Sequence, residues 1–106
     1  MECKLLSSLT KVFADQEPAA ENLPVAILKG EIASVQVAVR TNCIVEVTAS
    51  APGFRTVVRE VRQVPVGRTC SPGLDDDNYL RMTPGLYPDL LQEMPADSTT
   101  RVAGWW

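Results

Sequence analysis

The chain contains no histidine among its 106 residues. This absence excludes a Ser-His-Asp triad, a Cys-His pair and the usual histidine-containing zinc sites. Any catalysis would have to use carboxylates, lysine, tyrosine or cysteine alone. We therefore predict that the chain itself is not an enzyme and that it holds no metal ion and no cofactor.

An excess of basic residues is also lacking, because ten lysines and arginines face thirteen acidic residues and the net charge is −3. This balance argues against nucleic-acid binding. No apolar run reaches the ~20 residues that cross a bilayer, and the opening residues 1–4 do not begin a secretory signal. Three widely separated cysteines fit buried, reduced thiols better than a disulfide framework. These features predict a cytoplasmic protein with no nucleic-acid or membrane partner.

Valine is the residue that the sequence has in abundance, and ten of its thirteen valines lie between positions 35 and 66. Period-two alternation predicts a strand over residues 32–40 whose inward face carries Ala33, Val35, Val37 and Val39. The same alternation predicts a strand over residues 43–50. Because only two residues separate these strands, we expect an antiparallel hairpin.

Other segments give weaker strand signals. Residues 23–29 form a short apolar run that ends in a turn at Gly30-Glu31, and residues 55–66 predict a strand with a bulge midway. Because Pro65 has no N–H, the end of that strand is expected at a sheet edge or outside the sheet. Residues 3–13 match both helical and strand spacing, so that choice stays open. A loop is expected over 67–78, and the prolines that follow predict no long regular element.

Many short strands separated by turns predict an all-β fold, an immunoglobulin-like antiparallel β-sandwich forming a single domain over residues 1–106. Trp105 and Trp106 follow a turn-like Ala103-Gly104 and begin what reads as a new strand. We therefore expect the chain to be the N-terminal part of a larger protein, with its last strands missing. Self-association of the isolated chain is a further expectation.

Four groups of residues carry a resemblance to a known family. They are Thr10-Lys11-Val12-Phe13 with Asp15 and Glu17-Pro18; Lys29-Gly30-Glu31 with Gln36-Val37-Ala38-Val39; Val64-Pro65-Val66; and Leu86-Tyr87-Pro88-Asp89-Leu90-Leu91. In this order they resemble the N-terminal domain of family-123 glycoside hydrolases and related proteins of unknown function. The resemblance covers roughly the whole chain.

The resemblance implies a β-sandwich that precedes a (β/α)₈ barrel. In characterised members that barrel removes N-acetylgalactosamine from glycans with an adjacent Asp-Glu pair. A barrel needs ~200 residues or more, and no Asp-Glu dipeptide occurs in this sequence. The resemblance therefore implies a non-catalytic accessory domain whose partner is the catalytic barrel of the same parent chain.

Aromatic residues are few, and four of them are candidates for an interface or a sugar contact: Tyr79, Tyr87, Trp105 and Trp106. Exposed aromatic side chains usually mark a contact surface. A seam against a following domain is the favoured interpretation. Stacking on sugar rings, in an independent carbohydrate-binding module, is the alternative.

Several polar residues receive structural interpretations. We expect Glu31 to tie its turn by a hydrogen bond, Asp89 to accept backbone N–H groups, and Gln36 to cross-link strands or meet a neighbouring layer. The acidic run 75–78 is read as a solvated loop, with calcium binding as the minor alternative. Cys43 is placed on an apolar face, and Cys70 is the thiol to test for reactivity.

Overall fold

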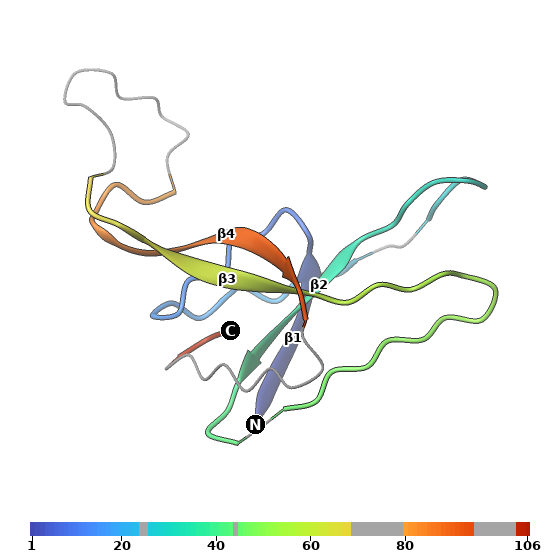
Figure 1. Cartoon of the computed structure of the whole chain (residues 1–106), viewed down its shortest axis with the longest axis horizontal. Helices are drawn as coiled ribbons and strands as arrows, with labels where there is room; N and C mark the ends of the chain where they lie inside the picture. Colours follow the sequence, from blue (N-terminus) through green and yellow to red (C-terminus); the bar gives the residue numbers. More distant parts are fainter. Residues whose placement is uncertain (24–25, 44, 69–79, 95–103) are drawn as a thin grey trace.

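The computed structural model describes residues 1–23, 26–43, 45–68, 80–94 and 104–106, and Figure 1 shows their arrangement. These residues form an all-β structure without a helix. Its strands are β1 (Glu2–Ser7), β2 (Val35–Arg40), β3 (Arg59–Val66) and β4 (Gly85–Glu93). The described ranges therefore contain no helix that is long and apolar enough to cross a membrane. The coarse prediction of an all-β chain is confirmed.

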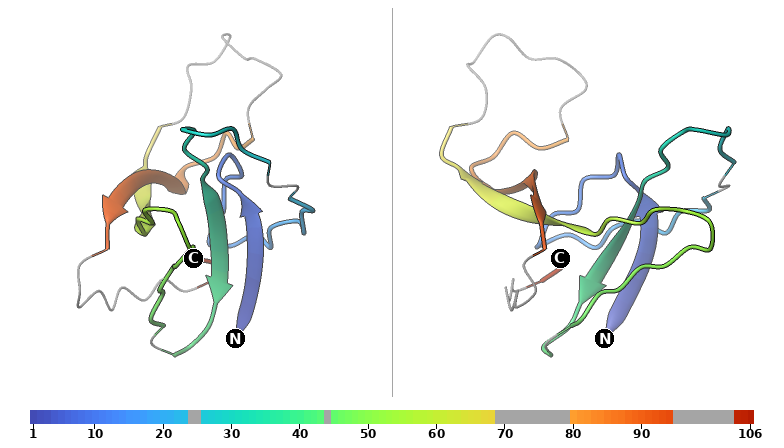
Figure 2. Two further views of the ribbon diagram at one scale, coloured as in Figure 1. Left: turned by 90° about the vertical axis from the view of Figure 1, so that its right-hand side faces the viewer. Right: turned by 45° about the vertical axis from the view of Figure 1, so that its right-hand side comes forward.

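The strands form two antiparallel sheets of two strands each, β1-β2 and β3-β4. Figures 1 and 2 show the two pairs in separate layers, with β3-β4 crossing over β1-β2. Between the layers runs the irregular segment that follows β1. The molecule is extended, with a radius of gyration of 15.7 Å, whereas a compact chain of this length has about 13 Å.

The first sheet pairs segments that are far apart in the sequence. β1 settles the choice that was open for residues 3–13, because Glu2–Ser7 is a strand and a turn follows, with the Thr10 N–H donating to the Ser7 carbonyl at 3.0 Å. Leu5 stands opposite Val37, and Leu6 opposite Gln36. Leu6 is fully buried while Leu5 is half-exposed, which is the period-two pattern of a strand.

Two of the expected strands are absent from the described residues. Residues 43 and 45–50 form no strand, and neither do residues 23 and 26–29, so the hairpin prediction is wrong. The reason is that both edges of β2 are already occupied at its C-terminal end, where residues 43–50 would have to pair. β1 pairs along one edge, and Trp106 exchanges backbone hydrogen bonds with Val39 on the other.

The second sheet contains the predicted bulge. The register of β3 and β4 shifts between Arg62 and Gln63, and Asp89 of β4 is the residue left without an opposite partner. β4 is the longest strand, so the expectation of no long element after Pro84 is wrong. Pro88 is tolerated inside β4 because it lies beside the bulge in a sheet whose strands are both edges.

The core is small, and most of the predicted inward face of β2 lies outside it. Val35 and Val37 are half-exposed, whereas Val39 of the predicted face and Ala38 of the opposite face are both buried. Ala38 faces the segment after β1 and the C-terminal tryptophan, because these cover the even-numbered face of the sheet. The buried cluster consists of Leu6, Val12, Ala38 and Trp105.

Candidate functional site

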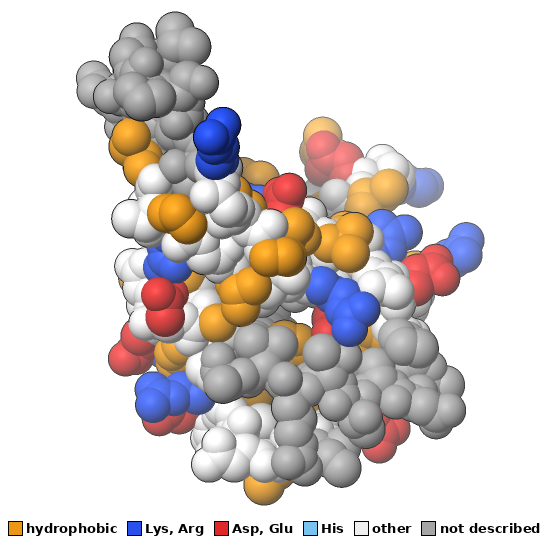
Figure 3. Space-filling view, turned by 60° about the vertical axis from the view of Figure 1, so that its left-hand side comes forward, with side chains coloured by type: hydrophobic (Ala, Val, Ile, Leu, Met, Phe, Trp, Pro, Cys, Tyr) orange, Lys and Arg blue, Asp and Glu red, His pale blue; other side chains and the backbone are white. Residues whose placement is uncertain are grey.

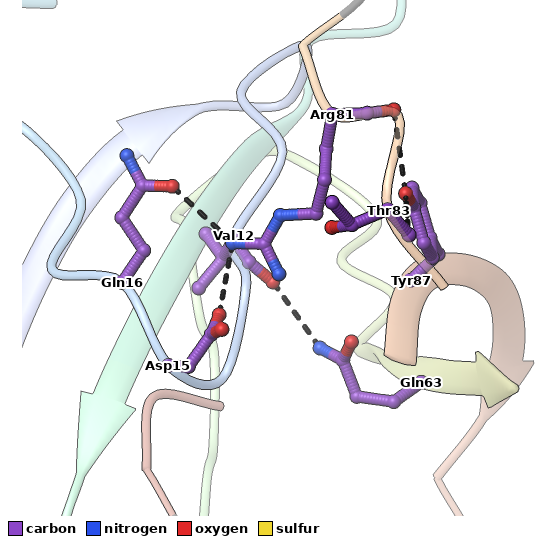
Figure 4. Close-up of polar contacts among 7 residues, drawn as sticks. All are labelled: Val12, Asp15, Gln16, Gln63, Arg81, Thr83 and Tyr87. Atoms are coloured by element: carbon purple, nitrogen blue, oxygen red, sulfur yellow. Dashed lines mark hydrogen bonds and ion pairs between the residues drawn. The ribbon is translucent and has the colours of Figure 1, made fainter. Parts of the chain in front are cut away.

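The segment of residues 10–16 lies between the two sheets and is fixed to both by side-chain amides. Gln36 of β2 donates from Nε2 to the Thr10 carbonyl at 3.2 Å. Gln63 of β3 donates from Nε2 to the Val12 carbonyl at 3.1 Å, as Figure 4 shows. The expectation that Gln36 meets a neighbouring layer is confirmed. These two bonds hold an irregular segment where no strand ladder could satisfy its carbonyls.

Arg81 is the most heavily used side chain of this region (Figure 4). Its guanidinium carbon stands 3.8 Å from the centre of the Phe13 ring. Its Nη2 donates to Asp15 Oδ1 at 2.9 Å and to Gln16 Oε1 at 3.4 Å. The hydrogen bond from Arg81 lowers the pKa of the Asp15 carboxyl from its ordinary value. Arg81 therefore links the segment before β4 to the segment after β1.

Tyr87, a candidate contact residue, is engaged inside the molecule. Its ring meets Phe13 edge-on, with 5.6 Å between ring centres and 82° between ring planes. Its hydroxyl lies 2.6 Å from the Thr83 carbonyl and 3.3 Å from the Arg81 carbonyl. The ring is half-buried. Its faces are therefore partly covered, which leaves a poor platform for a sugar ring.

Trp105 is buried as well, at 2% exposure. Its backbone N–H donates to the Ala14 carbonyl at 2.9 Å, and Lys4 Nζ lies 5.3 Å from the centre of its ring. Because Trp105 is enclosed by residues of the same chain, it cannot stack on a sugar or contact a neighbouring domain in this structure.

Trp106 is half-buried at the outer edge of β2. Its backbone N–H donates to the Val39 carbonyl at 2.8 Å, and the Val39 N–H donates back to the Trp106 carbonyl. Its indole Nε1 donates to Glu60 Oε1 at 3.2 Å. Arg62 lies 3.7 Å from the other oxygen of this buried carboxylate. Trp106 thus ties β2 to β3. Tyr79, the fourth candidate, lies outside the described residues.

The remaining polar predictions have mixed outcomes. Glu31 ties its turn as expected, because Oε2 accepts the Leu28 N–H at 2.8 Å. Asp89 instead forms an ion pair with Lys11, with 3.4 Å between Oδ1 and Nζ. The bulge explains this difference, because it leaves Asp89 outside the β3-β4 ladder.

The predicted burial of the cysteines is wrong where it can be compared, although Cys3 and Cys43 are free thiols. Cys3 and Cys43 are both exposed, because Cys3 lies on the solvent face of β1 and residue 43 is not part of a strand. Cys70 and the acidic run 75–78 lie outside the described residues. Among the residues that are described, no group of three or more His, Cys, Asp or Glu could hold a metal ion.

The described residues also expose a large number of hydrophobic side chains, which the internal contacts above do not use. Within the described ranges, six hydrophobic residues are buried and fifteen large hydrophobic residues are exposed. The β4 leucines, by which we mean Leu86, Leu90 and Leu91, belong to the exposed set. Figure 3 shows hydrophobic side chains in a band across one face, with charged groups beside it. This arrangement fits contact with another surface rather than chemistry within a site.

The β4 leucines were missed by the sequence analysis as a contact surface. Their segment was recognised only as a motif, Leu86 to Leu91, and only Tyr87 within it was named as a contact residue. The available signal was an apolar strand with a central proline, which requires an edge position. An edge strand rich in leucine is half-exposed unless a partner covers it.

Comparison with protein-family models gives no match for the chain, and comparisons with curated proteins and with solved structures give none either.

Proposed function

We propose that this chain is a non-catalytic accessory β domain that packs its exposed apolar surface against a second domain. The motif resemblance names that partner as the (β/α)₈ barrel of a glycoside-hydrolase-like parent protein. The role of the chain would be to support the barrel and to shape its substrate entrance. The exposed apolar surface carries this proposal.

The amount of surface supports a missing partner. Within the described ranges, fifteen large hydrophobic residues are exposed and six hydrophobic residues are buried. Contacts between domains of one chain bury roughly 600–1,500 Å². A contact of that size would cover several of the exposed side chains.

An immunoglobulin-like sandwich is the fold that we propose for the complete unit. Two crossed layers of antiparallel strands are its starting point (Figure 2), and about seven strands are required. A third strand beside β2 is part of this proposal, and the backbone exchange between Val39 and Trp106 supports it. Further strands along this edge and along β3-β4 would close both layers over the half-exposed valines and leucines.

The alternative, an independent carbohydrate-binding module, has less support. Among the described aromatic residues, Trp105 is buried and Tyr87 packs on Phe13, while Phe54 is exposed at 63% in a turn. A sugar platform normally needs several accessible rings. Titration with N-acetylgalactosamine oligosaccharides should therefore leave tryptophan fluorescence unchanged, and a saturable shift would favour the module.

Dye binding tests the exposed surface. The purified chain should increase the fluorescence of an anilinonaphthalene sulfonate dye, and a variant with all three β4 leucines changed to Gln should lose about half of that signal or more. Glu93→Gln, on the same strand, is the matched control and should change nothing. A chain that binds no dye, or a triple variant that binds as much as the original, would contradict the proposal.

The identity of the partner is tested on the parent gene. A reading frame that continues beyond codon 106 into alternating strand and helix patterns, with an Asp-Glu pair at a strand end, would support the barrel. A stop codon there would overturn it, whatever the dye experiment shows.

A further inference from the structure

Two β-turns of the same type project at one end of the molecule. They are residues 28–31 and 51–54, and Figures 1 and 2 show both tips at the same end of the long axis. In each turn the fourth residue's N–H donates to the first residue's carbonyl at 3.1 Å. The third residue is a glycine with positive φ, +90° at Gly30 and +80° at Gly53. These are the features of a type II turn, so both tips have a defined backbone.

Hydrogen bonds from side chains hold the two turns in shape. Glu31 Oε2 accepts the Leu28 N–H at 2.8 Å across the first turn. The Thr56 hydroxyl donates to the Ala49 carbonyl at 3.0 Å at the base of the second turn. The side chains at the tips are thus presented by an ordered backbone that belongs to neither sheet.

Both tips expose large apolar side chains. Leu28 is 73% exposed and Ile32 is 97% exposed at the first tip, and Phe54 is 63% exposed at the second. Exposure of this kind, gathered at one end of a molecule, marks a surface that meets a partner. Because the strand predicted over residues 23–29 is absent from the described residues, sequence reasoning missed this surface.

A cation stands beside the apolar group of each tip. Lys29 follows Leu28, Arg55 follows Phe54, and both charged residues are exposed. Glu31 is the sole acidic residue within the two turns and the three residues on either side of each. One of its oxygens is already used by the turn. The tips therefore carry a small local excess of positive charge in a chain whose net charge is −3.

We propose that the two tips bind the surface of a lipid bilayer that carries anionic headgroups. The apolar side chains of both tips enter the boundary between headgroups and acyl chains, while Lys29 and Arg55 meet the phosphates. Long basic side chains suit this position, because their stems lie along apolar surface while the charge stays in the polar layer. Apolar burial and attraction to anionic lipids act together in such interfacial binding.

The arrangement of the tips favours a bilayer over a protein surface. The apolar side chains stand on two separate projecting turns rather than on one continuous face (Figure 1). A bilayer closes around each tip independently, whereas a protein would need a matching cavity for each. The pairing of an apolar group with a cation also matches a layer whose interior is apolar and whose surface is negative.

This contact differs from the membrane spanning that the sequence analysis considered. The prediction of no membrane partner depended on the lack of an apolar run of ~20 residues. Peripheral binding needs only a few apolar side chains and a favourable charge. It requires neither the β4 leucines nor a second domain, so this inference is independent of the proposed function.

Co-sedimentation of the full chain with lipid vesicles tests the proposal. Vesicles of phosphatidylcholine with about one phosphatidylserine in four should bind half of the chain at about 1 mM lipid, because only a few side chains enter the surface. Vesicles of phosphatidylcholine alone should bind at least about fivefold more weakly, because each Lys or Arg near an anionic surface strengthens binding. Raising the salt concentration from about 0.05 M to about 0.5 M should remove that difference.

Variants of the tips separate the two contributions. Ile32→Ser with Phe54→Ser should weaken binding to both kinds of vesicle at least about tenfold. Lys29→Gln with Arg55→Gln should bind the mixed vesicles no better than phosphatidylcholine alone. Leu80→Ser is the matched control, because Leu80 is 76% exposed on the segment before β4, and it should bind like the original. If circular dichroism shows that the double serine variant is unfolded, Ile32→Ser alone decides the outcome.

Three results would overturn the proposal: no binding at up to about 10 mM lipid, tip variants that bind like the original, or equal weakening by Leu80→Ser. A chain that binds no vesicle leaves a protein surface as the occupant of the tips.

The variant with all three β4 leucines changed to Gln separates this inference from the proposed function. Vesicle binding that persists in that variant supports the tips as the lipid contact. Vesicle binding that is lost there places the lipid contact on β4 and overturns this inference. The proposed function is decided by dye binding without vesicles, so either proposal can fail while the other stands.

Discussion

Replacing Trp105 with alanine should remove most of the stability of the domain. The side chain is buried, at 2% exposure, and it belongs to the buried cluster with Leu6, Val12 and Ala38. An aromatic side chain of this size buries up to about 250 Å². Losing roughly 200 Å² of that surface costs about 5 kcal/mol at about 25 cal/mol per Å².

Two further considerations bracket this value. Measured Trp→Ala or Phe→Ala changes in cores cost about 3–5 kcal/mol, because the surroundings relax partly into the cavity. The contact of Lys4 Nζ over the ring, at 5.3 Å, adds about 0.5–1 kcal/mol. We expect a loss of about 4 kcal/mol, which approaches the whole stability of a small domain, about 5 kcal/mol at the low end of the usual range.

Urea unfolding followed by far-ultraviolet circular dichroism measures this loss, because the signal does not depend on the tryptophan that is removed. Phe54→Ala is the matched control, since Phe54 is 63% exposed, and it should cost less than about 0.5 kcal/mol. A Trp105→Ala variant that loses less than about 1 kcal/mol would refute the placement of this ring at the centre of the core.

Three other perturbations test separate parts of the structure. Gly104→Ala should cost more than about 3 kcal/mol in urea unfolding, because Gly104 has φ +106° and a Cβ there would overlap the Ala14 carbonyl. Gly53→Ala, with φ +80° and open space around it, should cost only about 1 kcal/mol, and equal costs would contradict this packing. Arg81→Ala should lower the free energy of unfolding by about 1–2 kcal/mol, because it removes the stack on Phe13 and the ion pair with Asp15. Arg81→Lys should recover part of this stability. An Arg81→Ala variant as stable as the original would contradict the link between the segments before β4 and after β1. A hydrogen bond from the Thr10 hydroxyl, followed by one from the Ser7 N–H, holds the pKa of Glu21 below its ordinary 4.5, so its stabilisation is complete above about pH 4.5 and is lost as the pH falls through the lower folded pKa. The urea concentration at the unfolding midpoint should therefore decrease as the pH is lowered from 6 to 3, and it should decrease less in Glu21→Gln. An equal decrease in both proteins would contradict this role.

The sequence pattern predicted strands better than it predicted their partners. Alternation located β2 and β3, and the bulge near Gln63 followed from the broken alternation of valines. The pairing of β1 with β2 could not be predicted, because it joins segments about thirty residues apart and no local rule selects it over a hairpin. Short connections bias expectation towards neighbours in the sequence.

The inward face of β2 was mispredicted for a related reason. Period-two alternation shows that two faces differ, but burial depends on what covers each face. Ala38 is buried because Trp105 and Val12 pack over it. Val37 is more hydrophobic and yet half-exposed, whereas Val39 on the same side is buried, because no described element covers that side at Val37 to the same degree.

The candidate residues also divide into those whose contacts are local in the sequence and those whose contacts are distant. The bond of Glu31 to the Leu28 N–H spans three residues and was predictable from turn chemistry alone. The burial of Trp105 depends on Leu6 and Ala38, which lie far away in the sequence. The sequence alone identifies an aromatic residue as a contact residue. Only the tertiary structure decides whether its partner belongs to the same chain or to another.

One physical cause explains the exposed apolar surface on which the proposed function rests. The tryptophan at position 105 fills the space between the layers, so the core is satisfied by a few residues from β1, β2 and the segment after β1. Many of the remaining apolar residues then have no interior to enter, and some of them lie on β4 and on the outer face of β2. Because these two surfaces belong to different sheets, covering one does not cover the other.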